Sequence, residues 1–449
     1  MKDLTVGNEL KAITLFSLPL LLGNIFQQLY NIVDSVVVGQ FIGSHALAAV
    51  GQSFPIIFIF ISLIMGFTMA ANILLAQFYG ARQIEQVKKV IHTTIIILFW
   101  CGIVISVLGY ITTPWTLRII HTPPEIYSSA VEYLQIIFIG MLFTFGYNGY
   151  AALLRGIGDS KTPLYGLIIS TILNIILDLL FVAVFHWGVK GAAWATIISQ
   201  GVAMFWLIAY AQIKIKEMQV NFFKLRFDKA ICSDSIKLGL PSGIQQALVG
   251  AGLTAMTSIV NTFGADAAAA YAAVGKLDSF AVMPAINIGM AISSFTGQNL
   301  GAKKTDRVRR GLRSSLFLGC IAVGISVLII LTFASFFLRI FGVNDEALKI
   351  GLSYLKIVAP GYILQSTMFI VGGVIRGAGD TLFAMISTLL AMWLVRVPLA
   401  YALSPHLSYN GVWLAIVIGF AIGCAANILY YFFGPWRKRA EKILRMGER

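Results

Sequence analysis

Twelve long apolar runs divide the sequence, and they constrain the fold more than any other feature. Each run is about 20 residues or longer, which is the length that an α-helix needs to cross the hydrocarbon core of a bilayer. The runs lie near residues 13–38, 52–78, 91–112, 130–152, 163–185, 190–212, 238–262, 278–300, 313–335, 354–375, 382–404 and 410–434. The sequence therefore predicts an all-α polytopic membrane protein with twelve transmembrane helices.

Composition supports this prediction. Hydrophobic residues make up 58% of the 449 residues, and only 12% are charged, against about 25% in a typical soluble domain. An ordinary soluble protein is thereby excluded. The first run continues past Val38 without a small-residue cleavage site, so we interpret it as a span and not as a removable signal peptide.

The positions of the basic residues explain the net charge of +14. If the termini and the even-numbered loops lie on one side of the membrane, most of the 33 Lys and Arg residues lie there too, including the run from Lys303 to Arg313. The positive-inside rule then makes this side, and both termini, cytoplasmic. The charge therefore indicates a lipid bilayer as the partner and argues against nucleic acid.

The two halves of the chain resemble each other. The segment AQFYGARQIEQVKKV, which begins at Ala76, matches GQNLGAKKTDRVRRG, which begins at Gly297, 221 residues later. Further matches at this offset are Tyr133 with Tyr354, Gly140 with Gly361, and RGIGD at Arg155–Asp159 with RGAGD at Arg376–Asp380. A six-span unit inserts in one orientation each time, so the copies relate by an axis along the membrane normal.

This repeat predicts the domain organisation. We expect two pseudo-symmetric six-helix bundles around a central cleft: an N-terminal lobe at 1–212 and a C-terminal lobe at 238–434. A hydrophilic stretch at 213–237 is expected to be a cytoplasmic connector, and 435–449 a basic cytoplasmic tail. Two such lobes suit alternating access, in which rocking exposes a site to each side in turn.

Only two carboxylates lie well inside the predicted spans, Asp34 and Asp178. An Asp at the bilayer centre costs about 2.5 to 3.5 kcal/mol on insertion scales, so such residues face an interior and mark ion or proton sites. Tyr30 and Asn174 each precede one of the acids by four residues, on the same helical face. Thr196 in the sixth span supplies a further hydroxyl oxygen.

These five residues form the predicted ion-coupling site. Sodium needs several oxygen ligands, and Asp34, Asn174, Asp178 and Thr196 could supply them. A proton needs only the two acids, because repulsion between two close carboxylates favours protonation of one. An acid that served only to fix helix packing is the less favoured interpretation.

The second copy lacks these acids. The positions that correspond to Asp34 and Asp178 hold Ala255 or Met256 and Leu399, so the ion chemistry is assigned to the N-terminal lobe. Arg396 is the one cation inside a predicted span, and snorkelling or pairing with backbone carbonyls accounts for it.

Other residues give weaker evidence for a substrate pocket and no evidence for a metal or catalytic site. Aromatic and Met side chains inside spans could line a pocket for a flat lipophilic ligand, although most such residues simply pack: Phe145, Tyr147, Phe280, Met283 and Met290. The four Cys residues form no C-x-x-C pair, and the five His residues are isolated. We therefore expect no disulfide, no cofactor and no enzyme active site.

Several motifs together resemble the multidrug and toxic compound extrusion (MATE) family, in its bacterial DinF-like and MepA-like branch. The motifs are YNIVDSVVVGQFIGSHALAAVG from Tyr30, AQFYGAR from Ala76, LLRGIGDSKTP from Leu153, LNIILDLLFV from Leu173 and GGVIRGAGDT from Gly372. The resemblance covers nearly the whole chain. It implies twelve helices in two lobes, and export of cationic or amphipathic drugs driven by protons or sodium ions.

The resemblance also implies site residues. The family's first-helix Asp falls on Asp34 with Tyr30 beside it, its fifth-helix Asn and Asp on Asn174 and Asp178, and its sixth-helix Thr on Thr196. This chain has Leu179 where family members often have Pro. It also lacks the acids that the NorM-like branch carries in the seventh and tenth helices, so no coupling site is expected in the second lobe.

The leading hypothesis is therefore a monomeric antiporter in the bacterial cytoplasmic (inner) membrane that exports multiple drugs and confers antibiotic resistance. The alternative is a flippase for a lipid-linked cell-envelope precursor. That function would need several cations along the cleft for a pyrophosphate, and Arg396 is the only candidate within a span. A primary pump is not expected, because the sequence has no Walker loop.

Overall fold

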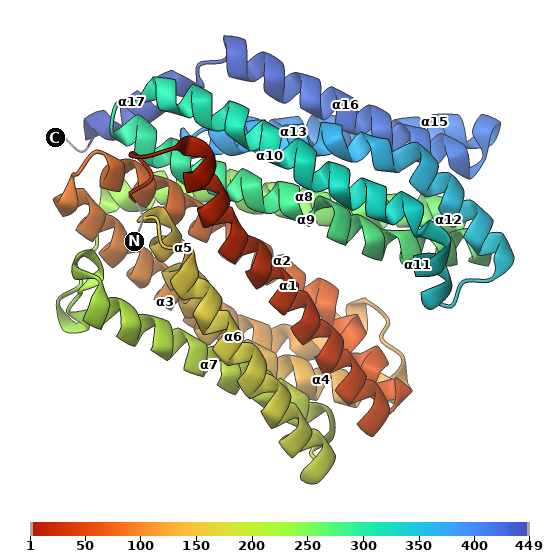
Figure 1. Cartoon of the computed structure of the whole chain (residues 1–449). Coiled ribbons are helices and arrows are strands. Elements are labelled where there is room, and N and C mark those ends of the chain that lie inside the picture. Colours follow the sequence, from red (N-terminus) through yellow and green to blue (C-terminus); the bar gives the residue numbers. More distant parts are fainter. Residues whose placement is uncertain (1–2, 447–449) are drawn as a thin grey trace. The chain divides into compact units, whose positions relative to one another are not determined.

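The apolar runs fold into long helices in the computed structural model, which describes residues 3–446 (Figure 1). Within this range there is no strand. Eleven helices are long and apolar enough to cross a membrane, and one bent pair brings the number to twelve. The predicted fold class is confirmed. A helix satisfies all backbone polar groups within one segment, which lipid requires.

The helices of the first half follow the predicted spans with longer ends. They are α1 (Glu9–Phe41), α2 (Ser44–Gly80), α3 (Ile84–Ile119), α4 (Pro124–Ile139), α5 (Met141–Gly156), α6 (Lys161–Asp178), the π-helical turn η1 (Leu179–Val184) and α7 (Gly188–Lys214). The fourth span is the bent pair, since α4 and α5 meet at 46°. Two short 3₁₀ turns follow, η2 (Lys216–Met218) and η3 (Phe222–Lys224).

The second half repeats this pattern. Its elements are α8 (Lys229–Asn261), α9 (Ala265–Gly301), α10 (Thr305–Thr332), α11 (Ala334–Ile340), α12 (Asp345–Val358), the 3₁₀ turn η4 (Ala359–Gly361), α13 (Tyr362–Gly377), α14 (Thr381–Leu389), the π-helical turn η5 (Leu390–Arg396), α15 (Val397–Leu407), α16 (Tyr409–Phe433) and α17 (Trp436–Met446). Both halves thus contain one π-helical turn, in their fifth span.

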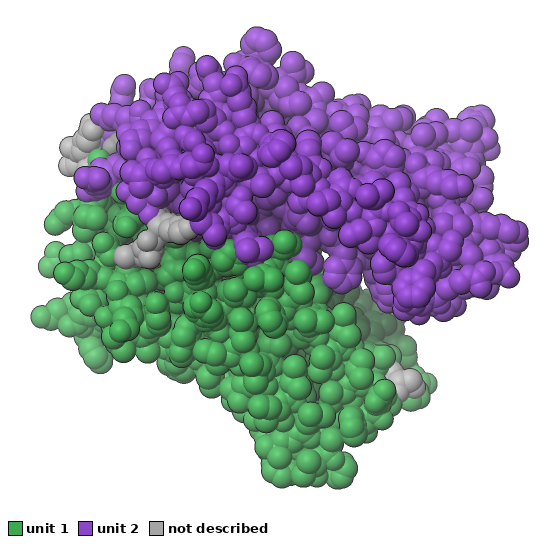
Figure 2. Space-filling view, in the orientation of Figure 1, with its two compact units in different colours: residues 1, 19–79, 83–243 green, residues 2–18, 80–82, 244–449 purple. Residues whose placement is uncertain are grey.

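The chain forms two compact units (Figure 2). Unit 1 comprises residues 19–79 and 83–243, and unit 2 comprises 80–82, 244–449 and the first residues through Leu18. The first residues, which we expected to belong to the N-terminal lobe, pack instead with unit 2. Leu4 is fully buried and donates its N–H to Gln298 Oε1 at 3.1 Å, and Arg307 Nη1 donates to the Gly7 carbonyl at 2.8 Å.

The stretch that we expected to be a connector is partly helical. Helix α8 begins at Lys229, and the boundary between the units falls inside this helix, after Gly243. The 3₁₀ turns before it are fastened to unit 1, because Met218 is fully buried and the Asp228 N–H donates to Thr93 Oγ1 at 3.1 Å.

The repeated glycines mark equivalent breaks in the two units. Gly140 ends α4 at the bend, and a Cβ there would lie 2.1 Å from Ile197 Cγ2. Gly361 lies in η4, between α12 and α13. The repeat seen in the sequence therefore preserves a break in the fourth span of each unit.

The repeated RG-x-GD motif builds a turn between two helices. Gly158 and Gly379 have φ angles of +90° and +89°, a conformation that favours glycine. The following Asp then binds the start of the next helix: Asp159 Oδ1 accepts from the Thr162 N–H at 3.0 Å, and Asp380 Oδ1 from the Phe383 N–H at 3.3 Å. Each motif thus ends one helix and caps the next.

The two caps differ in what else they bind, which yields a first prediction. Asp159→Ala is expected to destabilise the protein by about 1 kcal/mol, the usual cost of a lost cap. Asp380→Ala is expected to cost at least about 1 kcal/mol more, because buried Asp380 also accepts from Tyr430 Oη at 2.5 Å and Arg439 Nε at 2.9 Å. Apparent melting temperatures in detergent measure both. Equal shifts would mean that α17 is not fastened through Asp380.

Helix α17 occupies the region that we expected to be a basic tail. Trp436 is buried and stacks on Tyr431 at 5.3 Å between ring centroids, and its indole N–H donates to the Tyr431 carbonyl at 2.7 Å. Together with the Arg439–Asp380 ion pair, this contact holds the first turn of α17 against unit 2.

Candidate functional site

The two predicted acids come together in unit 1. Asp34 lies in α1 and Asp178 is the last residue of α6, and their carboxyl groups lie close enough to interact directly. Asp178 is fully buried. Two carboxylates this close repel each other when both are ionised, so the pair can carry a single exchangeable proton or share a cation.

Polar atoms of this cluster lack other partners. Asp34 Oδ1 and both carboxyl oxygens of Asp178 accept no hydrogen bond from an N–H or O–H group of the described residues. Both amide atoms of Asn174, also fully buried, are unpaired as well. Buried polar groups are normally satisfied, so this arrangement is suited to an additional cation or proton.

Tyr30 and Thr196, the remaining residues of the predicted ion-coupling site, lie at the same cluster. Tyr30 Oη lies 3.1 Å from Thr196 Oγ1, which joins α1 to α7 through one hydrogen bond. The structure thus brings the predicted oxygen ligands together from three helices.

Tyr133 of α4 is an addition that the sequence analysis missed. Its buried phenol lies within electrostatic range of Asp34, Tyr30 and Asp178. The only signal for it was the repeat, which pairs Tyr133 with Tyr354.

The helix around Asp178 departs from regular geometry. The π-helical turn η1 begins at Leu179, the residue that stands where family members often have Pro. A π-helical turn shifts the register of the residues that follow it, and such turns are frequent at functional sites. The break that proline would produce is therefore made here by a π-helical turn directly after the acid.

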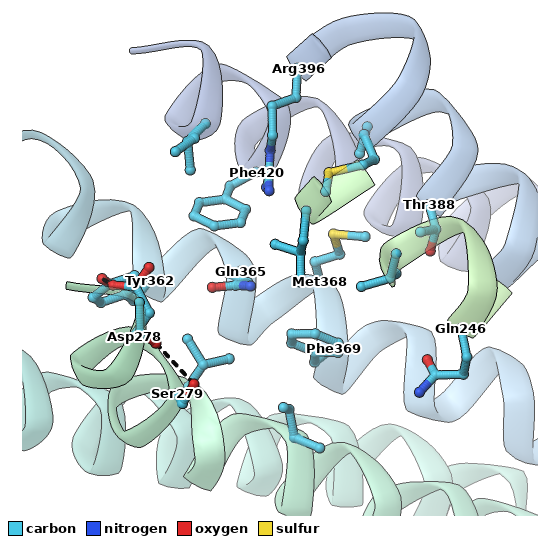
Figure 3. Close-up of a pocket in the computed structure, with 18 of the residues that line it drawn as sticks. Gln246, Asp278, Ser279, Tyr362, Gln365, Met368, Phe369, Thr388, Arg396 and Phe420 are labelled. Atoms are coloured by element: carbon cyan, nitrogen blue, oxygen red, sulfur yellow. Dashed lines mark hydrogen bonds between the residues drawn. The ribbon is translucent and has the colours of Figure 1, made fainter. Parts of the chain in front are cut away.

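Unit 2 contains a separate cavity of about 660 Å³ (Figure 3). Its walls come from α8, α9, α12, α13, α14, η5 and α16. Among the described residues, the five aromatic and Met residues proposed from sequence do not border it. Phe145 is fully buried in the core of unit 1, Tyr147 donates to the Pro163 carbonyl at 3.0 Å, Met283 is buried, and Phe280 is exposed. Met290 is partly buried in α9.

The cavity contains an acid that the sequence analysis placed only at the very start of a span. Asp278 lies inside α9, which begins well before it at Ala265. The tyrosines Tyr354 and Tyr362 each donate a hydrogen bond to Asp278, one to each carboxyl oxygen.

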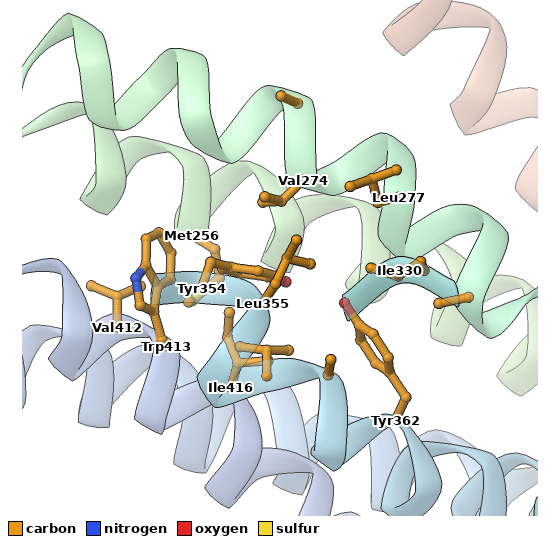
Figure 4. Packing of buried hydrophobic residues seen from close by; sticks show 14 of the residues in the cluster. Met256, Val274, Leu277, Ile330, Tyr354, Leu355, Tyr362, Val412, Trp413 and Ile416 are labelled. Carbon is orange, nitrogen blue, oxygen red and sulfur yellow. The ribbon is translucent and has the colours of Figure 1, made fainter. Parts of the chain in front are cut away.

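The apolar core of unit 2 fixes these tyrosines (Figure 4). Tyr354 packs edge-on against fully buried Trp413, with ring centroids 4.8 Å apart. Tyr362 belongs to the same cluster.

Two arginines also border the cavity. Arg396 lies at the end of η5, as a cation inside the eleventh span, and Arg376 lies near the end of α13. The predicted span ends near residue 375, and α13 continues past Arg376 to Gly377. Unit 2 therefore places one carboxylate and two guanidinium groups, all partly buried, around one cavity.

Comparisons with known proteins identify the family. The family model described as MatE matches residues 19–180 and 241–402, one match in each half of the chain. The probable multidrug resistance proteins YpnP and YoeA of Bacillus subtilis (strain 168) are 36% and 35% identical to this chain. The alignment with YpnP covers 97% of both chains, and that with YoeA covers 96% of this chain and 94% of YoeA.

Solved structures agree on the fold. One, described as the outward-facing conformation of a multidrug resistance MATE family transporter of the MOP superfamily, has a TM-score of 0.90 and 24% identity, and the match covers 99% of both chains. None of these three names supports the lipid-precursor flippase. Since the family model spans both halves and YpnP aligns along nearly the whole chain, the chain belongs to the MATE family, whose members are membrane transporters and not enzymes.

Proposed function

We propose that the protein is a secondary active multidrug exporter that couples efflux of cationic or amphipathic compounds to entry of H⁺ or Na⁺ by alternating access. The observation that carries this proposal is the pairing of Asp34 with fully buried Asp178, in which Asp34 Oδ1 and both Asp178 oxygens lack other partners among the described residues. The names of the Bacillus relatives support the multidrug part.

Ion entry and drug export are coupled if the ion and the drug favour different conformations of the protein. A ligand shifts an equilibrium only if it binds one state more tightly than the other. Binding of the ion at Asp34 and Asp178 favours a conformation with low drug affinity, so that ion uptake and drug release alternate. One charge that crosses 100 mV supplies about 2.3 kcal/mol, which is enough to bias such a cycle.

Either ion fits the chemistry of the cluster. A proton would be shared between the two carboxyl groups. Sodium would bind Asp34 and Asp178 together with neutral oxygens of Asn174, Thr196 and Tyr30. In the residues that the structure describes, no group of three or more His, Cys, Asp or Glu side chains could hold a metal ion, so a sodium site would depend on these neutral ligands.

The proposal includes a location and an orientation. The protein spans the bacterial cytoplasmic membrane with both termini in the cytoplasm, as the distribution of Lys and Arg predicts. This orientation is supported by the hydrogen bond that Lys304 Nζ donates to the Thr5 carbonyl at 2.9 Å, because it joins the N-terminal segment to the basic loop after α9.

Transport in proteoliposomes tests the function. With ethidium as a cationic probe and norfloxacin as a zwitterionic one, we expect a pH gradient or a sodium gradient, imposed separately, to drive export. The effective gradient should also be dissipated faster when drug is present. Export that responds to neither gradient would contradict the proposal, and the identity of the effective gradient would name the ion.

A further inference from the structure

The charged side chains around the unit 2 cavity differ in how fully their polar atoms are hydrogen-bonded. Both oxygens of Asp278 accept hydrogen bonds, from Tyr354 and Tyr362. By contrast, the Nε atoms of Arg376 and Arg396 are buried and have no hydrogen-bond partner among the described residues. Arg376 and Arg396 are therefore the charged groups that can still donate hydrogen bonds to a ligand.

Arg396 is the clearest case. Its guanidinium carbon lies 4.6 Å from the centroid of the Phe420 ring, and Figure 3 shows the side chain extending toward this ring. Within the described chain, no carboxylate lies within 4.0 Å of it in a salt bridge, although Asp278 attracts it at longer range. A buried cation without a close counter-ion is costly, and it persists where it has a role in binding.

Arg376 adds a second cation to the same cavity. Among the described residues, its Nη2 donates a long hydrogen bond, 3.4 Å, to the Phe369 carbonyl. Two guanidinium groups against one tyrosine-bound carboxylate leave the cavity with a net positive charge even when Asp278 is ionised.

The rest of the wall is suited to an apolar body. Side chains that contribute carbon or sulfur surface include Val282, Met368, Phe369, Met392, Ile416 and Phe420. The volume of about 660 Å³ lies within the usual range of ligand sites, about 300 to 1,000 Å³. Arginine binds carboxylates, sulfonates and phosphates through paired N–H groups.

We propose that this cavity is a substrate subsite that selects amphipathic molecules with an anionic group, which Arg396 and Arg376 bind. This inference rests on the proposed export function and specifies the compounds that unit 2 accepts. The two units then bind ligands of opposite charge. In unit 1 the acids near η1 bind the coupling cation, and in unit 2 Arg396, at the end of η5, binds the anionic group of the substrate.

Calorimetric binding tests the proposal on the full-length protein in nanodiscs, with protein-free nanodiscs as the blank. The probes share one apolar body: 3-(2-naphthyl)propanoate and 2-(2-naphthyl)ethyl-trimethylammonium. We expect the carboxylate to bind about tenfold or more tightly than the ammonium, because a hydrogen bond to a charged group strengthens binding by about tenfold or more. Equal affinities, or a preference for the ammonium, would overturn the proposal.

Variants assign the preference to the arginines. Arg396→Gln should weaken carboxylate binding about tenfold, and Arg396→Lys, which keeps the charge, should retain most of it. The matched control is Arg155→Gln, at the position in unit 1 that repeats Arg376; it should leave the preference unchanged. If Arg155→Gln and Arg396→Gln lower binding equally, the arginines act through the fold and the subsite assignment is wrong.

A lipid headgroup is a second source of the same anionic chemistry. Vesicles with fluorescent NBD-phosphatidylglycerol, bleached from outside by dithionite, distinguish it from a free acid. We expect no increase in bleaching with the wild type; Arg396-dependent bleaching would retain the anion site but move its ligand to a lipid. These binding measurements need no ion gradient, so they can succeed if coupling at Asp34 and Asp178 is disproved, and fail if it holds.

Discussion

Asp178→Asn is expected to reduce coupled export to background while the protein still inserts into the membrane. Asparagine has nearly the shape of aspartate but cannot carry the charge or the proton that the pair with Asp34 requires. Loss of one carboxylate removes a contact of the ion with a charged group, which contributes about 1.5 to 3 kcal/mol and corresponds to roughly tenfold to a hundredfold weaker ion binding. Asp34→Asn should have the same effect, because the two carboxyl groups act together.

Gradient-driven ethidium and norfloxacin export from proteoliposomes measures this effect, with insertion checked by the amount of folded protein recovered. Asp306→Asn is the control, because this carboxylate is exposed in the first turn of α10; its export should equal that of the wild type. Normal export by both the Asp34 and the Asp178 variants would remove the coupling site from unit 1.

The site in unit 1 could be predicted because its residues follow a local rule. Intramembrane acids are rare and costly, and an oxygen-bearing partner four residues earlier shares the same helical face. The contacts between helices needed the structure: the hydrogen bond between Tyr30 and Thr196 joins positions 166 residues apart. The position of Tyr133 beside the acids likewise depends on how α4 packs.

The cavity in unit 2 could not be predicted in the same way. Asp278 follows Lys276 closely, and this pair of charges made the apolar run begin at 278 although α9 starts at Ala265. The structure compensates each charge with a distant partner: Lys276 Nζ lies 4.8 Å from the Phe341 ring centroid, and the tyrosines that bind Asp278 come from later helices. A rule that ends spans at charged residues cannot anticipate partners this far along the chain.

Residue type alone does not distinguish a cavity wall from a packed core. Phe145 is apolar and intramembrane, as a pocket residue would be, yet it has no exposed surface and packs with Phe138 and Met141. The substrate-lining role of the five aromatic and Met residues stays a prediction. The cavity that the structure contains is bordered instead by residues such as Gln365, Met368 and Phe420 (Figure 3).

Gly373→Ala is expected to lower the melting temperature in detergent, although alanine favours helices over glycine by about 1 kcal/mol. A Cβ at Gly373 would lie 2.3 Å from the Gly289 carbonyl oxygen, and one at Gly377 would lie 2.3 Å from the Ser293 oxygen. The backbones of α9 and α13 therefore touch along a stripe of small residues, a common contact in membrane helices. Separating them should cost about 1 to 3 kcal/mol or more.

Gly324→Ala in α10 is the matched control, because a Cβ there would meet no atom within 4 Å. The same substitution should then raise the melting temperature, since only the gain in helix propensity remains. Opposite signs for the two variants would establish that contact at Gly373, and not helix propensity, sets the effect. A rise in both would mean that α13 can move away from α9 at little cost, and the cavity wall that carries Arg376 would then not be rigid.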